Sequence, residues 1–482
     1  MFKSVKINYI LNLINTGSQV LFPLITFPYA SRVMHPEGIG EVNFFSSIIG
    51  YISLFTCLGI PMYAVREIAR VRDDANKMQK TAIEILLLHL ILTLFGYFIV
   101  GVLSLTVPQI NEDLSLFLLL SLNLLLTAIG CEWFYNGIED FTYITIRGIL
   151  VKIVAIVFLF LFVHTRSDII YYGIYTVFGA LGGNIFNLYR LRKYIKINSF
   201  KGELNIFRHL KPALTVFVFS MVTSIYLQLS PVLLGFLKNT QSVGYYTSAT
   251  KIMQMMMMLS TCLGTAMMPR VSNLIAEGNK SEFKRLAQKA YDFTIATALP
   301  LSIGIILTSK YIVDVLCGPS FYDAVLPLQI VASNILIVGI SMVLGYQLLY
   351  PMGFLKIVIK CSVCGAITNL ILNIILIPSY AQNGTAVAYL AAELVTTIVM
   401  FYLGKKSLPI SYVRSHYLVY IVGSCVMWGV LFLVEQYIHL QSLFMLILMG
   451  GVGIIIYLSC LLICKDELIT PTVKGIYLKF KR

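Results

Sequence analysis

The sequence predicts an all-α polytopic membrane protein of about 14 transmembrane helices, and three observations support this: composition, apolar runs and the placement of basic residues. Of 482 residues, 58% are hydrophobic and 12% are charged, and the mean hydropathy is +0.84. Soluble domains carry roughly 45–50% apolar and about 25% charged residues. Because one bilayer crossing needs about 20 apolar residues, this length allows up to about fourteen spans joined by short loops.

The apolar runs themselves number fourteen when the sequence is scanned for stretches long enough to cross the bilayer. The division between the fifth and sixth runs is the least distinct, since only His164 to Asp168 separate them. The expected spans are 10–31, 42–65, 82–105, 115–133, 148–164, 168–188, 212–236, 244–268, 291–309, 325–348, 357–378, 384–403, 416–434 and 442–464.

Basic residues alternate sharply between the loops. Of the 36 lysines and arginines, 30 fall on one side, two lie within spans, and the other four are Arg32, Arg166, Lys238 and Lys310. Cytoplasmic loops carry the excess of Lys and Arg, so this pattern predicts an even number of spans with both termini in the cytoplasm. The net charge of +14 is then a consequence of topology, and no nucleic-acid partner is expected.

The chain also shows signs of an internal duplication. Gly40 and Gly244 occupy similar positions in two helical hairpins, and Arg66 and Arg270 share their offset of 204. Six spans separate the copies, which predicts parallel repeats related by an axis along the membrane normal. The expected domains are a six-helix lobe at 1–188, a basic cytoplasmic linker at 189–211, a second six-helix lobe at 212–403, and two additional helices with a basic tail at 404–482.

Enzymatic motifs are not found in the sequence. The six histidines are scattered near span ends, and no HExxH, GxSxG or P-loop pattern occurs. The acidic pairs Asp73-Asp74 and Glu139-Asp140 are interpreted as solvated loop charges. We therefore expect no catalytic residue, no metal and no cofactor.

Polar residues follow one face of the first span. Asn8, Asn12, Asn15 and Gln19 recur at +4, +3 and +4, which places them on one side of a helix. Such a face must turn toward protein or water. It can serve interhelical hydrogen bonding, or it can line a hydrated cavity, and the spacing does not separate the two. The seventh span carries a comparable polar set that ends at Gln228.

Charged residues within spans are fewer and more informative, because an unpaired charge at mid-bilayer costs about 2.5–3.5 kcal/mol even on lenient insertion scales. Arg32 and Lys152 lie near span ends, where long side chains can snorkel to water. Lys251 lies deeper, which favours a cavity role. Glu393, the only acid well inside an expected span, either makes a structural hydrogen bond or couples an ion.

Cationic residues in a cavity suit an anionic substrate such as a diphosphate, which needs charged partners once it is stripped of water. Arg32, Lys152 and Lys251 are therefore the candidate diphosphate contacts. A carrier of drug cations would favour acidic or aromatic cavities instead.

Several motifs together resemble those of one transporter family. They are Pro23-Leu-Ile-Thr-Phe-Pro-Tyr-Ala-Ser-Arg32, Pro36-Glu-Gly-Ile-Gly40, Arg66-Glu-Ile-Ala-Arg70, Glu132-Trp-Phe134, Thr368-Asn-Leu-Ile-Leu-Asn373 and Gly384-Thr-Ala386 with Glu393. This set resembles the Wzx-type oligosaccharide flippases, in the polysaccharide transport branch of the superfamily that also holds the MATE exporters and MurJ. One departure is Met34-His-Pro-Glu-Gly38, where the family usually has LGPEG.

The resemblance covers the first twelve spans and implies a function. It implies two lobes that alternately open a cationic cavity in the bacterial cytoplasmic membrane. The substrate would be a polyprenyl-diphosphate-linked oligosaccharide, flipped to the outer leaflet for O-antigen, capsule or exopolysaccharide synthesis, with a polysaccharide polymerase and a chain-length regulator as further partners. A MATE-like, cation-coupled exporter of small molecules is the alternative.

Overall fold

The computed structural model describes residues 5–195, 203–408 and 410–466, except for side chains in parts of α1, α10 and α11. The described residues are organised as helices and their connections. In the first half these are α1 (Val5–Cys57), α2 (Ile60–Val71), α3 (Ala75–Thr106), α4 (Pro108–Asn111), α5 (Leu114–Gly130), α6 (Glu132–Gly137), α7 (Phe141–Phe162), η1 (Arg166–Asp168), α8 (Ile169–Leu181), α9 (Gly183–Leu191), η3 (Ile206–His209) and α10 (Leu210–Leu237). The second half has α11 (Thr240–Ala276), α12 (Lys280–Leu316), η4 (Pro319–Ala324), α13 (Val325–Ala332), α14 (Asn334–Met342), the π-helix η5 (Val343–Leu349), α15 (Leu355–Gly404), α16 (Tyr417–Tyr437) and α17 (Ser442–Ile463).

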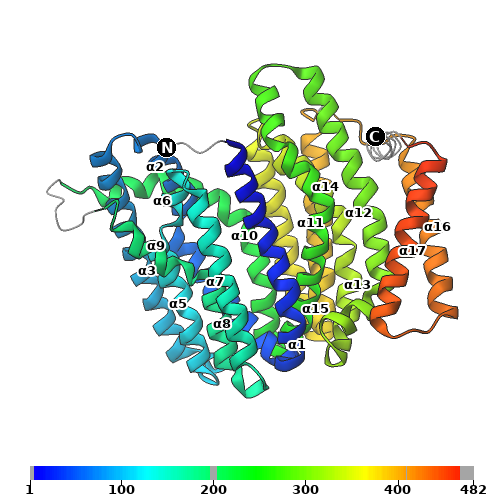
Figure 1. Ribbon diagram of the computed structural model, residues 1–482, viewed down its shortest axis with the longest axis horizontal. Helices are drawn as coiled ribbons and strands as arrows, with labels where there is room; N and C mark the ends of the chain where they lie inside the picture. The colour runs from blue at the N-terminus through cyan, green and yellow to red at the C-terminus, as the bar shows by residue number, and fades with distance from the viewer. Residues whose placement is uncertain (1–4, 196–202, 409, 467–482) are drawn as a thin grey trace. The chain divides into compact units, whose positions relative to one another are not determined.

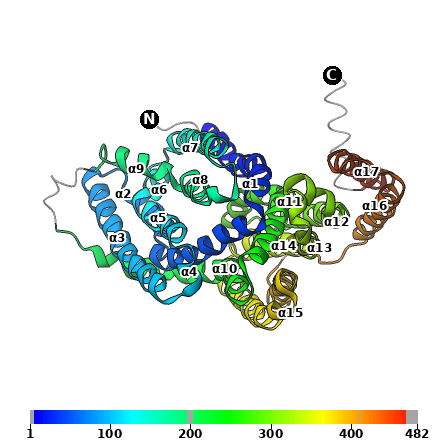
Figure 2. The ribbon, with the colours of Figure 1, turned by 90° about the horizontal axis from the view of Figure 1, so that it is seen from below.

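The chain packs as two units, Met1–Gly244 and Tyr245–Arg482. Figures 1 and 2 show each unit as a bundle of long helices. Helix α10, which the sequence places at the start of the second lobe, packs in the first unit against α1, α2 and η3. The lobe boundaries expected from the sequence therefore stay a prediction.

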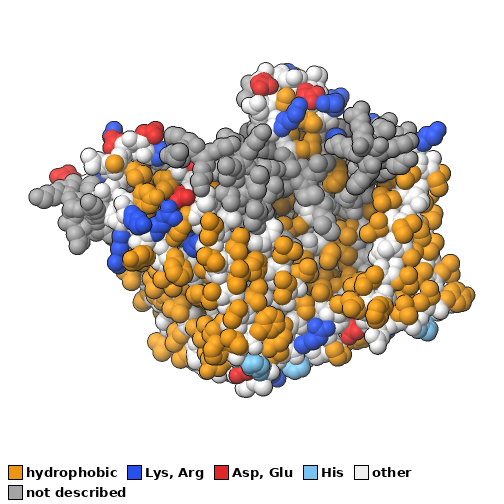
Figure 3. All heavy atoms as spheres, in the orientation of Figure 1, with side chains coloured by type: hydrophobic (Ala, Val, Ile, Leu, Met, Phe, Trp, Pro, Cys, Tyr) orange, Lys and Arg blue, Asp and Glu red, His pale blue; other side chains and the backbone are white. Residues whose placement is uncertain are grey.

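The fold is all-α and polytopic, as expected. Among the described residues, eight helices are long and apolar enough to cross a membrane, or up to ten if each bent pair counts as one span. Figure 3 shows hydrophobic side chains over the middle of the helices. The predicted number of fourteen spans is not established by this count.

Two of the helices are too long for one crossing, and each is broken. Helix α1 has 53 residues and would reach roughly 80 Å, far more than the ~30 Å hydrocarbon core. It breaks at His35, where φ is 57°. Pro36 explains the position, because a residue before proline is kept out of the helical region. Helix α15, with 50 residues, breaks similarly at Ala381.

The break after α5 is stabilised by two buried amides from α9. Cys131 adopts a left-handed conformation (φ 44°), which ends α5 and leaves its last carbonyls without helical partners. The Asn184 side chain donates to the Leu126 carbonyl at 2.9 Å, and Asn187 donates to the Gly130 carbonyl at 2.6 Å. The two asparagines thus fix α9 against the end of α5.

The two repeat glycines meet each other inside the first unit. A Cβ added at Gly40 would overlap the Thr240 carbonyl oxygen, and one added at Gly244 would overlap the Pro36 carbonyl oxygen. With the offset of 204, Pro36 corresponds to Thr240 and Gly40 to Gly244. Gly40 thus contacts Thr240 as Gly244 contacts Pro36. Such a reciprocal pair of contacts is typical of an interface with two-fold symmetry. This supports the duplication inferred from the sequence.

Ion pairs join the basic loops of the first unit. Arg72 binds Glu139 at 2.6 Å, and Arg190 binds Asp140 at 2.6 Å. The loop after the second expected span, the loop after the fourth and the loop after the sixth thus lie at one end of this unit. The same alternation was expected from the distribution of basic residues.

Candidate functional site

Lys152 lies beside the first half of α1. It is the twelfth residue of α7, because that helix begins at Phe141, so it is deeper than the sequence-based span suggested. Its ammonium donates to the Ser18 hydroxyl at 2.8 Å and lies 5.5 Å from the centre of the Phe22 ring. A hydroxyl and an aromatic face are weak compensation for a charge in an apolar bundle. A further anionic partner would therefore be favourable here.

The contacts of Lys152 fall on the polar side of α1. Phe22 and Thr26 extend the series Asn8, Asn12, Asn15 and Gln19 by a further +3 and +4, so they share its face. Thr26 is buried, and its hydroxyl donates to the Phe22 carbonyl at 3.0 Å. The four amide side chains themselves lie outside the described residues, so their contacts stay a prediction.

Arg32 lies on the same helix but is not brought to Lys152 by any contact described here. Its side chain is exposed, and it donates to the Pro28 carbonyl one turn earlier at 3.1 Å. The exposed position agrees with a guanidinium near the end of a span. A diphosphate contact by Arg32 stays a prediction.

Gln228 packs across the interface between α10 and α1. A Cβ at Gly50 would lie 2.8 Å from the Gln228 amide nitrogen, so the amide fits only because residue 50 is glycine. Gly235 lies against the Phe44 ring, and Gly59 against the backbone at Ala213 and Phe217. Glycines thus allow α10 to lie close to α1 and to the start of α2 at several levels.

Lys251 and Glu393 belong to the second unit. Lys251 is the twelfth residue of α11, and its side chain is exposed. Glu393 is 4% exposed, on the second half of α15. One turn further on, the Thr397 hydroxyl donates to the Ile337 carbonyl of α14 at 3.5 Å, so this side of α15 faces α14. The roles of both residues stay predictions.

The Glu132-Trp-Phe134 motif has a structural role. It forms the start of α6, where Trp133 and Phe134 are buried. Next to it, the Tyr135 hydroxyl donates to the Asn187 carbonyl at 2.7 Å. The short helix α6 packs against α2, and the Tyr135 hydroxyl links it to α9. No group of acidic, histidine and cysteine side chains suited to a metal occurs among the described residues.

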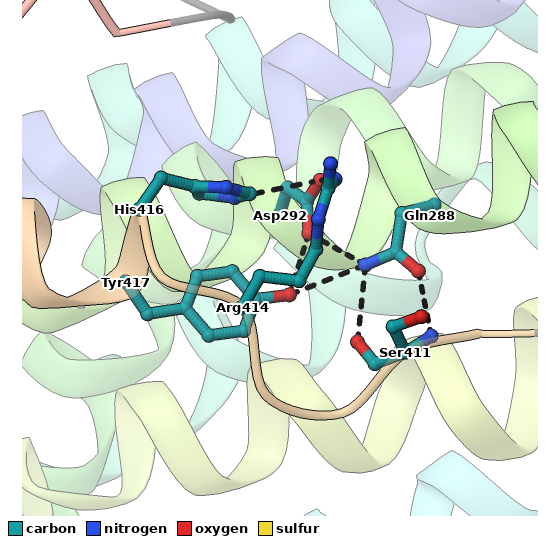
Figure 4. A network of polar contacts seen from close by, with 6 residues as sticks. All are labelled: Gln288, Asp292, Ser411, Arg414, His416 and Tyr417. Carbon is teal, nitrogen blue, oxygen red and sulfur yellow. Dashed lines mark hydrogen bonds and ion pairs between the residues drawn. The ribbon is translucent and has the colours of Figure 1, made fainter.

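Two buried acidic clusters were missed by the sequence analysis. Glu84 lies ten residues into α3 and is 0% exposed, and Asp292 lies in α12 and is 4% exposed. Figure 4 shows Asp292 receiving contacts from Arg414, His416 and Tyr417, with Gln288 beside it. Both acids were placed at the ends of expected spans and so attracted no notice. The sequence signal that could have found them is a histidine at the start of the seventh and of the thirteenth apolar run, namely His209 and His416.

Solved structures of helical membrane proteins share the fold of this chain. The solved structure of the lipid II flippase MurJ in an inward closed conformation superposes with a TM-score of 0.77, at 17% identity, covering 96% of this chain and all of that one. An inward-facing multidrug resistance MATE transporter superposes with a TM-score of 0.66, at 17% identity, covering 83% of this chain and 98% of that one. At this identity the likeness concerns the fold alone.

The sequence comparisons identify the family. The family model described as "Polysaccharide biosynthesis protein" matches residues 5–275, and the chain belongs to this family. The MatE family model also matches, over residues 215–375.

Curated relatives extend over most of the chain. A protein of Escherichia coli K12 named "Putative O-antigen transporter" is 25% identical over 84% of this chain and 98% of its own length. A Haloferax volcanii protein named as a "Probable low-salt glycan biosynthesis flippase" is 23% identical over 60% of this chain and 61% of its own.

Proposed function

We propose that this chain is a flippase that moves polyprenyl-diphosphate-linked oligosaccharide repeat units from the cytoplasmic to the outer leaflet for surface polysaccharide synthesis. The family match over residues 5–275 carries the proposal, together with relatives named for O-antigen transport and glycan flipping. The MurJ-like fold supports it. The chain would act as a transporter by alternating access and would perform no catalysis.

The substrate contacts follow from charge and hydrogen-bonding capacity. Arg32, Lys152 and Lys251 would bind the diphosphate, and the amides of the first span together with Gln228 would bind sugar hydroxyls. The Lys152 ammonium supports this assignment, because its described partners in the bundle are a hydroxyl and an aromatic face. The polyprenyl tail would stay in the lipid.

The proposed location and topology are supported by the distribution of basic residues among the loops. The cytoplasmic membrane, with both termini in the cytoplasm, is the location that the asymmetry of Lys and Arg supports. The proposed lobes are 1–188 and 212–403, joined by the linker 189–211, with 404–482 as an addition. A polysaccharide polymerase and a chain-length regulator would work with the flippase.

Deletion of the gene, followed by analysis of lipid-linked sugars, tests the function. Loss of a flippase should leave complete repeat units on the cytoplasmic leaflet and remove the surface polymer. Re-expression of the chain should restore the polymer. Truncated repeat units after deletion would instead indicate a role in sugar transfer, and unchanged surface polysaccharide would exclude the proposal.

Single substitutions test the binding residues. Lys152→Ala and Lys251→Ala should strongly reduce export while the protein remains in the membrane. Lys310→Ala is the matched control, because Lys310 is an exposed lysine at the end of α12 and should tolerate the change. Full export by both Lys152→Ala and Lys251→Ala would exclude these lysines as contacts of the diphosphate.

A cation-coupled exporter of small molecules is the second candidate, favoured by the MatE match over residues 215–375. In that case Glu393 would couple the ion. Overexpression should then confer resistance to drugs, and deletion should leave surface sugars intact. The Glu393→Gln variant separates the two roles of this residue, because an ion-coupling role predicts transport that no longer responds to the ion gradient.

A further inference from the structure

The segment that follows the sixth expected span is fastened to α3 by Glu84. One carboxylate oxygen accepts a hydrogen bond from the Asn205 backbone N–H at 2.7 Å. The other oxygen is 2.5 Å from the Arg208 guanidinium and 3.0 Å from His209 Nε2. All three donors come from residues 205–209, at the end of the predicted linker. One short stretch of chain therefore supplies all three of these donors to a fully buried carboxylate.

The same segment is held from a second side by α2. The Tyr63 hydroxyl lies 2.7 Å from His209 Nδ1, and their rings pack with centres 5.7 Å apart. Arg208 Nε also donates to His209 Nε2 at 3.2 Å, so Glu84 and Arg208 both lie at this ring nitrogen while Tyr63 lies at Nδ1. His209 is 3% exposed, so water does not replace these partners.

The second unit has a similar cluster at the segment that follows the twelfth expected span. Asp292 accepts hydrogen bonds from the Tyr417 hydroxyl at 2.6 Å and from Arg414 at 2.8 Å, and His416 lies 3.8 Å away. Gln288, which corresponds to Glu84 at the offset of 204, accepts from the Ser411 backbone N–H at 2.7 Å. Each unit thus combines a buried acid, an arginine, a histidine, a tyrosine and one backbone N–H.

Both clusters join equivalent parts of the repeats. Helix α3 is the third expected span of the first repeat, and α12 is the third of the second. The segment 205–209 precedes α10, and the segment 411–416 precedes α16. The two acids lie one helical turn apart in the repeats, since Asp292 corresponds to Leu88 at the offset of 204, but both clusters join the same two elements with the same residue types.

We propose that Glu84 and Asp292 are positioning residues. Glu84 anchors segment 205–209 to α3, and Asp292 anchors segment 411–416 to α12. The contact of Glu84 with segment 205–209 stays intact throughout transport. The role in transport rests on the flippase function proposed above. Helix α10 begins at Leu210, directly after His209, so the anchor fixes its first turn. The same helix carries Gln228 to Gly50 of α1.

Replacing the contact by a removable covalent link tests the anchor. Glu84→Cys and His209→Cys, which replace the two partners of the contact between α3 and the segment, are combined in a variant whose nine native cysteines are replaced by serine or alanine. The protein is reconstituted in vesicles with a polyprenyl-diphosphate-linked oligosaccharide that carries a fluorophore on its sugar. Flipping is measured with an impermeant quencher, before and after treatment with a flexible bifunctional thiol reagent long enough to replace both side chains.

The expected result is a loss followed by a rescue. Without the reagent, flipping should fall at least several-fold, and cross-linking should restore more than half of it. The single-cysteine variants, treated in the same way, should stay impaired. Full flipping without the reagent would overturn the proposal, and so would a cross-linked protein that flips no better than the reduced one, because the anchor would then be dispensable or would have to open.

Two further measurements keep the test decisive. Asp292→Cys with His416→Cys applies the same design to the second anchor, where cross-linking should also restore flipping. If the cysteine-free parent flips no oligosaccharide, the proposed function has failed, and the anchor is judged by thermal unfolding without substrate. The midpoint should then drop in the reduced pair and return on cross-linking, and an unchanged midpoint would overturn the proposal.

Discussion

The two anchors use the same residue types but differ in how far they are sealed from water. The Glu84 side chain is 0% exposed and His209 4%, whereas Asp292 is 6% exposed and His416 17%; the arginines are both partly exposed, Arg208 at 44% and Arg414 at 34%. Buried ion pairs depend strongly on every partner, because a charge left behind cannot be hydrated. The acid and the histidine are thus more fully shielded from water at the start of α10 than at the start of α16.

The largest difference should follow from removing the two acids. Glu84→Ala leaves the buried His209 ring and the Asn205 N–H without their acceptor, at about 1–3 kcal/mol each, and removes the partner of Arg208, so it should lower the free energy of unfolding by about 3–5 kcal/mol. Denaturation in mixed micelles measures the change. Glu112→Ala, at an exposed glutamate of the same unit, should change it by less than about 0.5 kcal/mol. Equal values for both variants would contradict the buried-anchor interpretation.

The second acid should matter less. Asp292→Ala removes hydrogen bonds to a charged group, but Arg414 can turn to water, so a loss of about 1.5–3 kcal/mol is expected. The same micelle denaturation gives the value, with the exposed Asp323→Ala as control. A loss as large as that for Glu84 would show that the two anchors are equally sealed.

The repeat glycines provide an independent comparison between the copies. Gly40→Ala and Gly244→Ala each place a methyl group onto a backbone carbonyl oxygen of the other copy, so each should cost about 1–3 kcal/mol by overpacking. Gly429→Ala is the control, because no atom lies near its added Cβ and helix propensity favours alanine by about 0.8–1.0 kcal/mol. Strongly unequal losses at Gly40 and Gly244 would break the reciprocity.

The smallest effect concerns pH. Burial lowers the pKa of His209 below its ordinary value of 6.5, and Arg208 lowers it further, whereas Glu84 and Glu67 act in the opposite direction. The unfolded chain then binds the proton more readily, so the stabilisation from neutral His209 is present above about pH 6.5 and is lost as the pH falls below it.

Thermal unfolding between about pH 8 and about pH 5 measures this dependence. The midpoint should fall on acidification in the parent protein. In His209→Gln the fall should be shallower, because the group whose pKa is lowered by folding is then absent. An identical slope in the parent and in His209→Gln would exclude His209 as its source.

The sequence predicted the all-α membrane fold, the alternation of basic loops and the duplication, because each depends on composition or on a repeat that needs no contacts. Depth within a span was less accessible. Helix α7 begins at Phe141 rather than at residue 148, since Asp140 caps it by accepting from the Tyr143 N–H, and Lys152 is correspondingly deeper. The anchors could not be predicted, because Glu84 and His209 are 125 residues apart and only folding brings them together.

The reciprocal contact of Gly40 and Gly244 has a consequence for how the two copies can vary. Matching residues that touch each other's copy are the pattern expected where two identical polypeptides pair about a two-fold axis. In two identical polypeptides a single change at this glycine would alter both contacts at once. In one polypeptide the two positions can change separately, but each only as far as the backbone of the other copy tolerates an added side chain.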